Sequence, residues 1–277
     1  IVLSIGAIIY SLSLPNLYQS KAILTSVSDS NTGSSSSSMK SYSGLANLAG
    51  ISLPTNNNSK TIKAVQKMNT LSFFENQILP NIYLPDLMAL KSWNSSTNEI
   101  IYDSGIYDHV SETWAGNSNN TKTQIPSPQE SFNIFIQHFR VTHDIENGFI
   151  YLSVKHQSPF IAQQWTKLII DEINKFYRVK DRLEAQFSMD YLNQQMLKTG
   201  FAEIKMVIAQ LLQQKVQQLA LIEVNDFYVF EYIDPPAAME KKSEPVRSII
   251  CFVGAFLGAI LGCAISLIRN YYFDNKT

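Results

Sequence analysis

An uncharged run of about twenty residues near the C-terminus, 249–268 (IICFVGAFLGAILGCAISLI), constrains the possible folds more than any other feature. A helix of this length spans about 30 Å, the thickness of the hydrocarbon core of a bilayer. Arg247 and Arg269 bracket the run and residues 271–273 (YYF) follow it, as charged and aromatic side chains do at a membrane interface. We therefore predict a transmembrane helix over residues 249–268 and a short cytoplasmic tail over residues 269–277.

A second apolar segment opens the chain. Residues 1–9 (IVLSIGAII) cover only about half of a membrane span, and the chain does not begin with methionine. We interpret residues 1–14 as the outer half of a first transmembrane helix, truncated at its start. The alternative is the hydrophobic region of a signal peptide, but no small-residue cleavage site follows before Pro15. Two spans place both termini on one side of the membrane, and the Lys and Arg residues around the second span do not decide which side.

The net charge and the cysteines restrict the partners and the compartment. The net charge is −1 and no basic stripe appears, which argues against nucleic acid as a partner. Both cysteines, Cys251 and Cys263, fall within the predicted span, so residues 15–248 contain no thiol. A thiol-free domain suits an oxidising compartment such as a periplasm.

Alternating segments predict a small sheet. Residues 139–143 (FRVTH) and 148–155 (GFIYLSVK) alternate as half-buried strands do, and residues 144–148 (DIENG) favour the turn of an antiparallel hairpin. Residues 18–27 and 227–233 are expected to add one strand each. We predict an α+β fold in which residues 15–158 form a membrane-proximal α/β domain with a small mixed sheet.

Helices are expected to complete this domain. Their predicted positions are 43–51, 61–79 (ended by Pro80) and 129–138, with short helices and loops over 81–131.

A long helical arm is predicted over residues 159–224. Ser158-Pro159 is a strong helix start, with Ser158 able to cap the first backbone amides. Apolar residues then recur at spacings of three and four for about forty residues, until Thr199 and Gly200 interrupt the pattern. A helical hairpin that turns at these two residues is the simplest geometry, because the chain must return to the membrane. A single longer helix kinked at Gly200 is the alternative.

Two further features concern the approach to the second span. Residues 225–248 are expected to form the returning strand and a linker that contains Pro235, Pro236 and Pro245. Within the span, Gly254, Gly258 and Gly262 recur at every fourth position. Small residues at this spacing let another helix approach closely in lipid, so we predict a packing face there. Its partner is either the first span or a neighbouring subunit.

Residues that could carry chemistry do not form a recognisable site. The chain has four histidines, but no pair stands at i,i+4 on a predicted helix and no Cys or carboxylate has ligand spacing. Ser104-Gly105 and Ser43-Gly44 lack the surroundings of a nucleophile elbow. We predict no enzyme activity, no metal and no cofactor.

The order of the segments resembles the Wzz-type chain-length determinant family, also called polysaccharide co-polymerases. The resemblance covers nearly the whole chain. It rests on LPNLYQSKAIL, GLANLAGI, YDSGIYDHVSETW, SVKHQSP, FIAQQWTKLIIDEINKFYRVKDRLEA and VFEYIDPP, followed by the proline-containing approach to the last span. The arm is shorter than in many members and no kinase domain follows Phe273, so the chain resembles the stand-alone type.

The resemblance implies a non-enzymatic, homo-oligomeric protein of the bacterial inner membrane. Its two spans would hold the main domain in the periplasm and both termini in the cytoplasm. It would control the chain length of O-antigen or a related polysaccharide through contact with the membrane polymerase or the lipid-linked polymer. A periplasmic sensory receptor anchored by two spans is the rival hypothesis, since it shares this topology.

Overall fold

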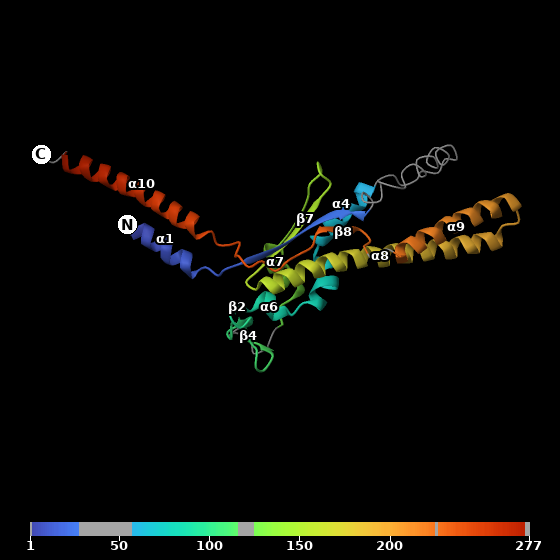
Figure 1. Ribbon diagram of the computed structural model, residues 1–277, viewed down its shortest axis with the longest axis horizontal. Helices are drawn as coiled ribbons and strands as arrows, with labels where there is room; N and C mark the ends of the chain where they lie inside the picture. The colour runs from blue at the N-terminus through green and yellow to red at the C-terminus, as the bar shows by residue number, and fades with distance from the viewer. Residues whose placement is uncertain (1, 28–56, 116–124, 225–226, 275–277) are drawn as a thin grey trace.

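The computed structural model describes residues 2–27, 57–115, 125–224 and 227–274. Figure 1 shows an elongated molecule: helices α1 (Val2–Ser13) and α10 (Arg247–Asp274) lie side by side at one end, and a long helical hairpin extends from the opposite end. A sheet and several short helices lie between them. The α+β class with a long helical arm is thus confirmed. The helix expected over 43–51 lies outside the described residues.

The main sheet has four strands in the order β6-β7-β1-β8. Their bounds are β1 (Tyr18–Ser26), β6 (Phe139–His143), β7 (Ile150–His156) and β8 (Phe230–Asp234). The predicted β6–β7 hairpin is confirmed, with Phe139 opposite Val154 and His143 opposite Ile150. Its turn is closed by the Gly148 amide, which donates to the Asp144 carbonyl at 2.8 Å, and Gly148 adopts a φ of 73° that favours glycine.

The prediction of a mixed sheet is wrong, because all three strand pairings are antiparallel. Strands β7 and β8 run in the same direction and would form a parallel pair if they were neighbours. Strand β1 lies between them and is antiparallel to both. Which strand separates two others is set by contacts far apart in sequence, and these leave no mark on local alternation.

Helix α8 (Pro159–Lys198) covers one face of this sheet and has the predicted length. Its first half is part of the domain core, since Trp165, Ile169, Ile170 and Ile173 are buried against alternate side chains of β1 and β7. Beyond Tyr177, Ala185 is the one fully buried residue of α8. The free arm therefore starts near Tyr177 and not at the beginning of the helix.

The cap predicted at the start of α8 is wrong in its detail. The Ser158 side chain makes no capping hydrogen bond. Its backbone amide instead donates to Nδ1 of His156 at 3.0 Å, and its carbonyl accepts from the Ala162 amide at 3.1 Å. The proline at the first helical turn still fits, because an amide there has no helical partner.

The single helix predicted over 61–79 is also wrong. The structure has α4 (Asn57–Met68), α5 (Leu71–Phe73), the π-helical turn η2 (Phe74–Ile78) and the 3-10 turn η3 (Leu79–Asn81). Thr70 breaks the run, because its backbone is extended and its hydroxyl accepts from the Phe73 amide at 3.3 Å, which starts a new helix.

Residues 81–131 contain two strand pairs that were not predicted. Helix α6 (Leu84–Met88) leads into the pair β2 (Leu90–Asn94) and β3 (Glu99–Tyr102), and β4 (Tyr107–Asp108) pairs with β5 (Thr113–Trp114). Helix α7 (Pro128–His138) follows at the predicted place and begins with a capping box between Ser127 and Glu130.

In the described part of the chain, no helix has both the length and the apolar character required to cross a membrane. Residues 264–268 of the span predicted over 249–268 lie outside the residues whose side chains the structure describes.

Candidate functional site

The free part of α8 and helix α9 (Ala202–Val224) form the arm, and they pack against each other along their length (Figure 1). Ala185 on α8 is buried, as are Ile208 and Ile222 on α9. Near the base of the arm, Nε of Arg182 lies 2.5 Å from Oε1 of Glu223 and joins the two helices. Both side chains are more than a third exposed, so apolar packing contributes more to this pairing than the ion pair does.

Thr199 and Gly200 lie in the connection between α8 and α9. The Thr199 amide donates to the Gln195 carbonyl at 3.1 Å and completes the last turn of α8. A Cβ atom added to Gly200 would meet nothing within 4 Å, so no close approach requires glycine there. Phe201, which completes the connection, is 70 % exposed.

An apolar stripe follows the face of α8 that α9 leaves uncovered. Val179, Leu183, Phe187 and Tyr191 stand four residues apart and therefore lie along one side of the helix. Phe187 is 76 % exposed and Leu183 is 59 % exposed. Ala185, which faces α9, is about 200° around the helix from each of these two. The stripe is thus an apolar surface on the side of the arm away from its own partner helix.

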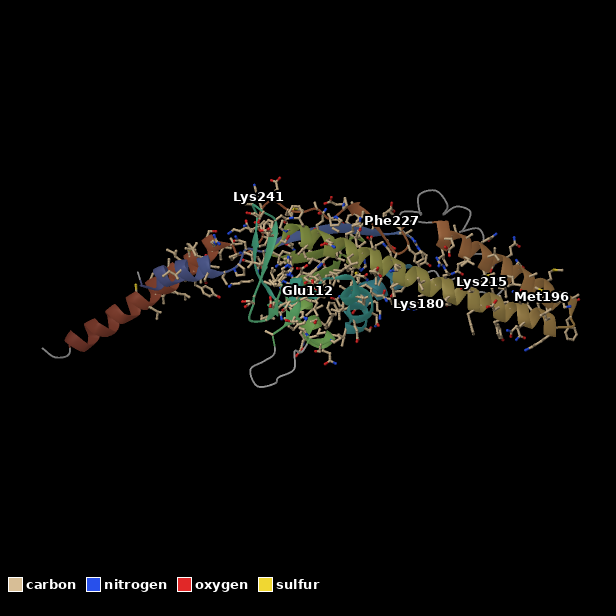
Figure 2. The ribbon with its side chains drawn as sticks, turned by 90° about the horizontal axis from the view of Figure 1, so that it is seen from below. Glu112, Lys180, Met196, Lys215, Phe227 and Lys241 are labelled. Atoms are coloured by element: carbon tan, nitrogen blue, oxygen red, sulfur yellow. The ribbon has the colours of Figure 1, made fainter. Side chains whose placement is uncertain are left out.

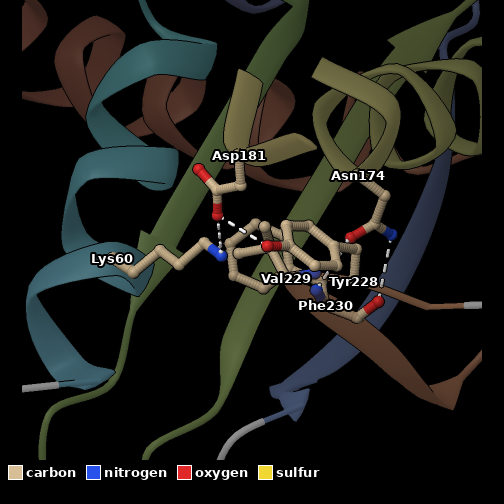
Figure 3. A network of polar contacts seen from close by, with 6 residues as sticks. All are labelled: Lys60, Asn174, Asp181, Tyr228, Val229 and Phe230. Carbon is tan, nitrogen blue, oxygen red and sulfur yellow. Dashed lines mark hydrogen bonds and ion pairs between the residues drawn. The ribbon is translucent and has the colours of Figure 1, made fainter. Parts of the chain in front are cut away.

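The base of the arm is tied to β8 by Asn174, a buried residue of α8. Its Oδ1 accepts hydrogen bonds from the Val229 amide at 2.8 Å and the Phe230 amide at 2.9 Å. Its Nδ2 donates to the Phe230 carbonyl at 3.0 Å. Figure 3 shows the Asn174 amide group facing the backbone of the strand, to which it both donates and accepts hydrogen bonds as a neighbouring strand would. The side chain satisfies buried backbone groups that would otherwise be costly to leave unpaired.

A second attachment lies about two helical turns further along α8 (Figure 3). Oδ2 of Asp181 lies 2.6 Å from Nζ of Lys60 on α4, and it accepts a hydrogen bond of 2.6 Å from the Tyr228 hydroxyl. Nζ of Lys60 also lies 4.0 Å from the centre of the Tyr228 ring. Burial raises the pKa of Tyr228 well above its usual range, and the bond to Asp181 raises it further. The phenol therefore stays protonated and donates.

The proline-containing linker contacts the start of α8 and the segment that follows α1. Pro236 is buried and its carbonyl accepts from Nε2 of Gln163 at 3.0 Å, whereas Pro235 is exposed. Just before Pro245, the Leu17 amide donates to the Glu244 carbonyl at 2.9 Å. These bonds hold the segment that leads into α10 against the segment that leaves α1.

The three glycines of the predicted packing face do not have equal surroundings. Gly254 and Gly258 are half-buried, together with Ile250 and Cys251, on one side of α10. Since α10 packs against α1, this side is the one that faces α1. Gly262 is exposed, and a Cβ atom there would meet nothing within 4 Å. Packing between α1 and α10 thus involves two of the three positions.

The chain has four histidines, and histidine is the commonest metal ligand among side chains. Among the described residues, no group of His, Cys, Asp and Glu side chains is arranged to hold a metal ion. His156 is buried at the end of β7, where its Nδ1 accepts from the Ser158 amide and its Nε2 lies 3.1 Å from the Asp86 carbonyl. Burial lowers the pKa of His156 to about 4, so the ring is neutral and Nε2 carries the proton.

The attachments at the arm base were missed from the sequence. Polar residues within or beside an apolar repeat usually mark an exposed helix face. Three such residues are Asn174, Asp181 and Tyr228. The one available signal was Asn174 itself, since it directly follows Ile173 on the buried side of the apolar repeat. A polar residue there needs a buried partner.

Comparisons with known proteins give matches to solved structures. The chain is similar to a "full-length bacterial polysaccharide co-polymerase", with 14% identity and a TM-score of 0.39, over 99% of this chain and 92% of that one. It is also similar to a fragment of the polysaccharide co-polymerase WzzB from Salmonella Typhimurium, with 12% identity and a TM-score of 0.34, over 83% of this chain and all of the fragment. No family model matches the sequence. None of the curated proteins matches it.

These two structures are named for the class of protein that the sequence motifs resemble.

Proposed function

We propose that this chain is a non-enzymatic co-polymerase that controls the length of O-antigen or a related polysaccharide as a homo-oligomer. In this proposal α1 and α10 anchor it in the bacterial inner membrane, the domain and the arm stand in the periplasm, and both termini are cytoplasmic. Its partners are the membrane polysaccharide polymerase and the lipid-linked polymer. The order of the family-like motifs supports this assignment.

The observation that carries the proposal is the two-ended shape of the molecule. The apolar helices α1 and α10 leave the domain on one side, and the arm leaves it on the other (Figures 1 and 2). A chain held at one end by such a pair presents its arm well away from the anchor. Neighbouring copies anchored in the same plane would then have their arms side by side.

The apolar stripe supports assembly through the arms. Monomeric proteins rarely leave a row of large apolar side chains this exposed. Covering the exposed parts of Val179, Leu183, Phe187 and Tyr191 on association would contribute on the order of 5 kcal/mol for each copy.

Light scattering after size-exclusion chromatography of the detergent-solubilised chain tests the assembly. We expect the wild type to elute as an oligomer, and the double variant Leu183→Ser and Phe187→Ser to shift toward smaller species. The matched control is Asn193→Ser, an exposed polar position of the same helix that lies about 120° around the helix from Phe187, and it should leave the mass unchanged. A strictly monomeric wild type would refute the oligomer.

A polysaccharide gel tests the function itself. Deletion of the gene should change the distribution of polymer lengths, and complementation with the wild type should restore it. The stripe variant should complement poorly while the Asn193→Ser control complements fully. A polysaccharide ladder that deletion does not alter would refute the function. It would favour the sensory receptor, because a receptor is not expected to change polymer length.

A further inference from the structure

A cationic pocket lies where α1 ends and α10 begins. It has a volume of about 460 Å³ and is lined by Asn16, Tyr18, Lys91, Trp93, Gln157 and Arg247, with the end of α1 as its rim. Strand β2 brings Lys91 and Trp93 to it from the small hairpin. No Asp or Glu side chain lies among the described residues that line it.

Among the described residues, the positive charges of this pocket have no counter-charge from the protein. Nη2 of Arg247 and Nζ of Lys242 each lie 3.1 Å from the same neutral oxygen, Oδ1 of Asn16. The carboxylate of Glu244, close by in sequence, lies 2.5 Å from Nζ of Lys155 instead. Among the described residues, neither Lys91 nor Arg247 takes part in an ion pair.

Arg247 also has a buried donor that is not used. Its Nε is buried and makes no hydrogen bond to any described residue. A buried guanidinium nitrogen without an acceptor is costly, and an anionic oxygen in the pocket would supply that acceptor. Two cations held close together by one amide oxygen repel each other, and a bound anion would remove that repulsion as well.

The surroundings of the pocket indicate that the anion is attached to an apolar chain. Ile8, Ile9 and Leu12 on α1 are exposed, as are Phe252 and Phe256 on α10. The Tyr18 and Trp93 rings meet edge to face at 5.4 Å beside the pocket, and such amphipathic rings favour the headgroup level of a bilayer. The end of α1 and the start of α10 exert opposing dipole fields here, so the side chains decide the sign of the charge.

We propose that this pocket binds the phosphate group of an anionic lipid, with Arg247 and Lys91 as its ligands and the lipid chain along α1 and α10. The inference rests on the proposed anchoring of these two helices in a membrane. It adds a ligand class and named residues to that anchoring.

Native mass spectrometry of the full chain, released from nanodiscs of phosphatidylcholine and phosphatidylglycerol, tests the proposal. The wild type should retain phosphatidylglycerol in preference to phosphatidylcholine. The double variant Lys91→Gln and Arg247→Gln should retain at most about a tenth as much phosphatidylglycerol as the wild type, because two charge-assisted hydrogen bonds are lost. The control Lys241→Gln, an exposed lysine outside the pocket (labelled in Figure 2), should behave as the wild type. Arg247→Lys, which keeps the charge, should retain most of the lipid even if the double variant folds poorly.

Three results would overturn the proposal. Equal lipid loss in the Lys241→Gln control would mean a general attraction of interfacial cations. Unchanged retention in the double variant would mean that the pocket is not the site. Pyrophosphate that binds the wild type while phosphatidylglycerol does not would identify a soluble anion as the ligand. Lipid retention is measured on purified protein, so its failure is distinguishable from an unaltered polysaccharide ladder, which would refute the proposed function.

Discussion

Replacing Asn174 by leucine tests whether the arm base depends on a buried amide. Leucine has the same number and branching of side-chain heavy atoms as asparagine and fits a helix, so the change removes the hydrogen bonds and keeps the shape of the side chain. It leaves the amides of Val229 and Phe230 and the carbonyl of Phe230 without their side-chain partner. Asn174 is only 6 % exposed, so water has little access to these groups.

The magnitude follows from the number of groups left unpaired. Each buried backbone group that loses its partner costs about 1–3 kcal/mol, and the added apolar burial returns about 1–2 kcal/mol. We expect the free energy of unfolding to fall by about 3 kcal/mol, a large share of the roughly 5–15 kcal/mol typical of a domain.

Urea unfolding of the detergent-solubilised chain, followed by tryptophan fluorescence, measures this change. Trp165 is buried in the same helix and reports the opening of the core. The control Asn193→Leu, an exposed position on the arm, should change stability by less than about 0.5 kcal/mol. A loss of under about 1 kcal/mol in Asn174→Leu would refute the reasoning, because it would mean that β8 finds other partners without cost.

Three further changes have expected outcomes from the same urea titration. Asp181→Asn should cost about 1 kcal/mol, since its ion pair with Lys60 is partly exposed, and the difference from wild type should shrink in high salt. Ser127→Ala should cost about 1 kcal/mol through loss of the capping box of α7, and Ser127→Asp should restore most of it. His156 stays neutral in the fold down to a pKa of about 4, whereas the unfolded chain takes up its proton below 6.5. Wild-type stability should therefore fall by about 3 kcal/mol between these pH values, and His156→Asn should remove that part of the slope. Burial raises the pKa of Asp86, which gives a slope of the opposite sign in both proteins, so only the difference between them tests His156.

The elements predicted correctly are those whose signal is local. Helix α8 follows from an apolar repeat sustained over its whole length, and the β6–β7 hairpin follows from alternation on both sides of a glycine-containing turn. Helix α4 was extended too far because one residue, Thr70, forms a cap inside an otherwise continuous repeat. Periodicity averages over such a residue and does not detect it.

The strand order and the arm base could not be predicted because they depend on contacts between distant segments. Asn174 and Phe230 are 56 positions apart, and Lys60 and Asp181 are 121 apart. The short hairpin of β2 and β3 had a usable signal in the turn-forming residues 94–98 (NSSTN) between two apolar segments. The edge-to-face packing of Trp93 against Tyr18, which holds this hairpin in place, had no signal in the local sequence pattern.

The arm is long compared with the base that holds it, and this ratio makes the buried hydrogen bonds of Asn174 important for the direction of the arm. From Asn174 to Lys198, α8 extends about 36 Å, whereas Asn174 and Asp181 are only about 10 Å apart on one face of the helix. A slip of about 1 Å at one attachment therefore moves the tip by about 3 Å, a third of the distance between packed helices. An exposed ion pair would allow such slips, because its geometry is loose and solvent competes for its partners. Three bonds from one buried amide at Asn174, together with the shared carboxylate of Asp181, fix the helix at two points and so fix its direction. If the stripe on α8 is to meet a neighbouring copy, the accuracy of that meeting is decided at the base of the arm, far from the residues that make the contact.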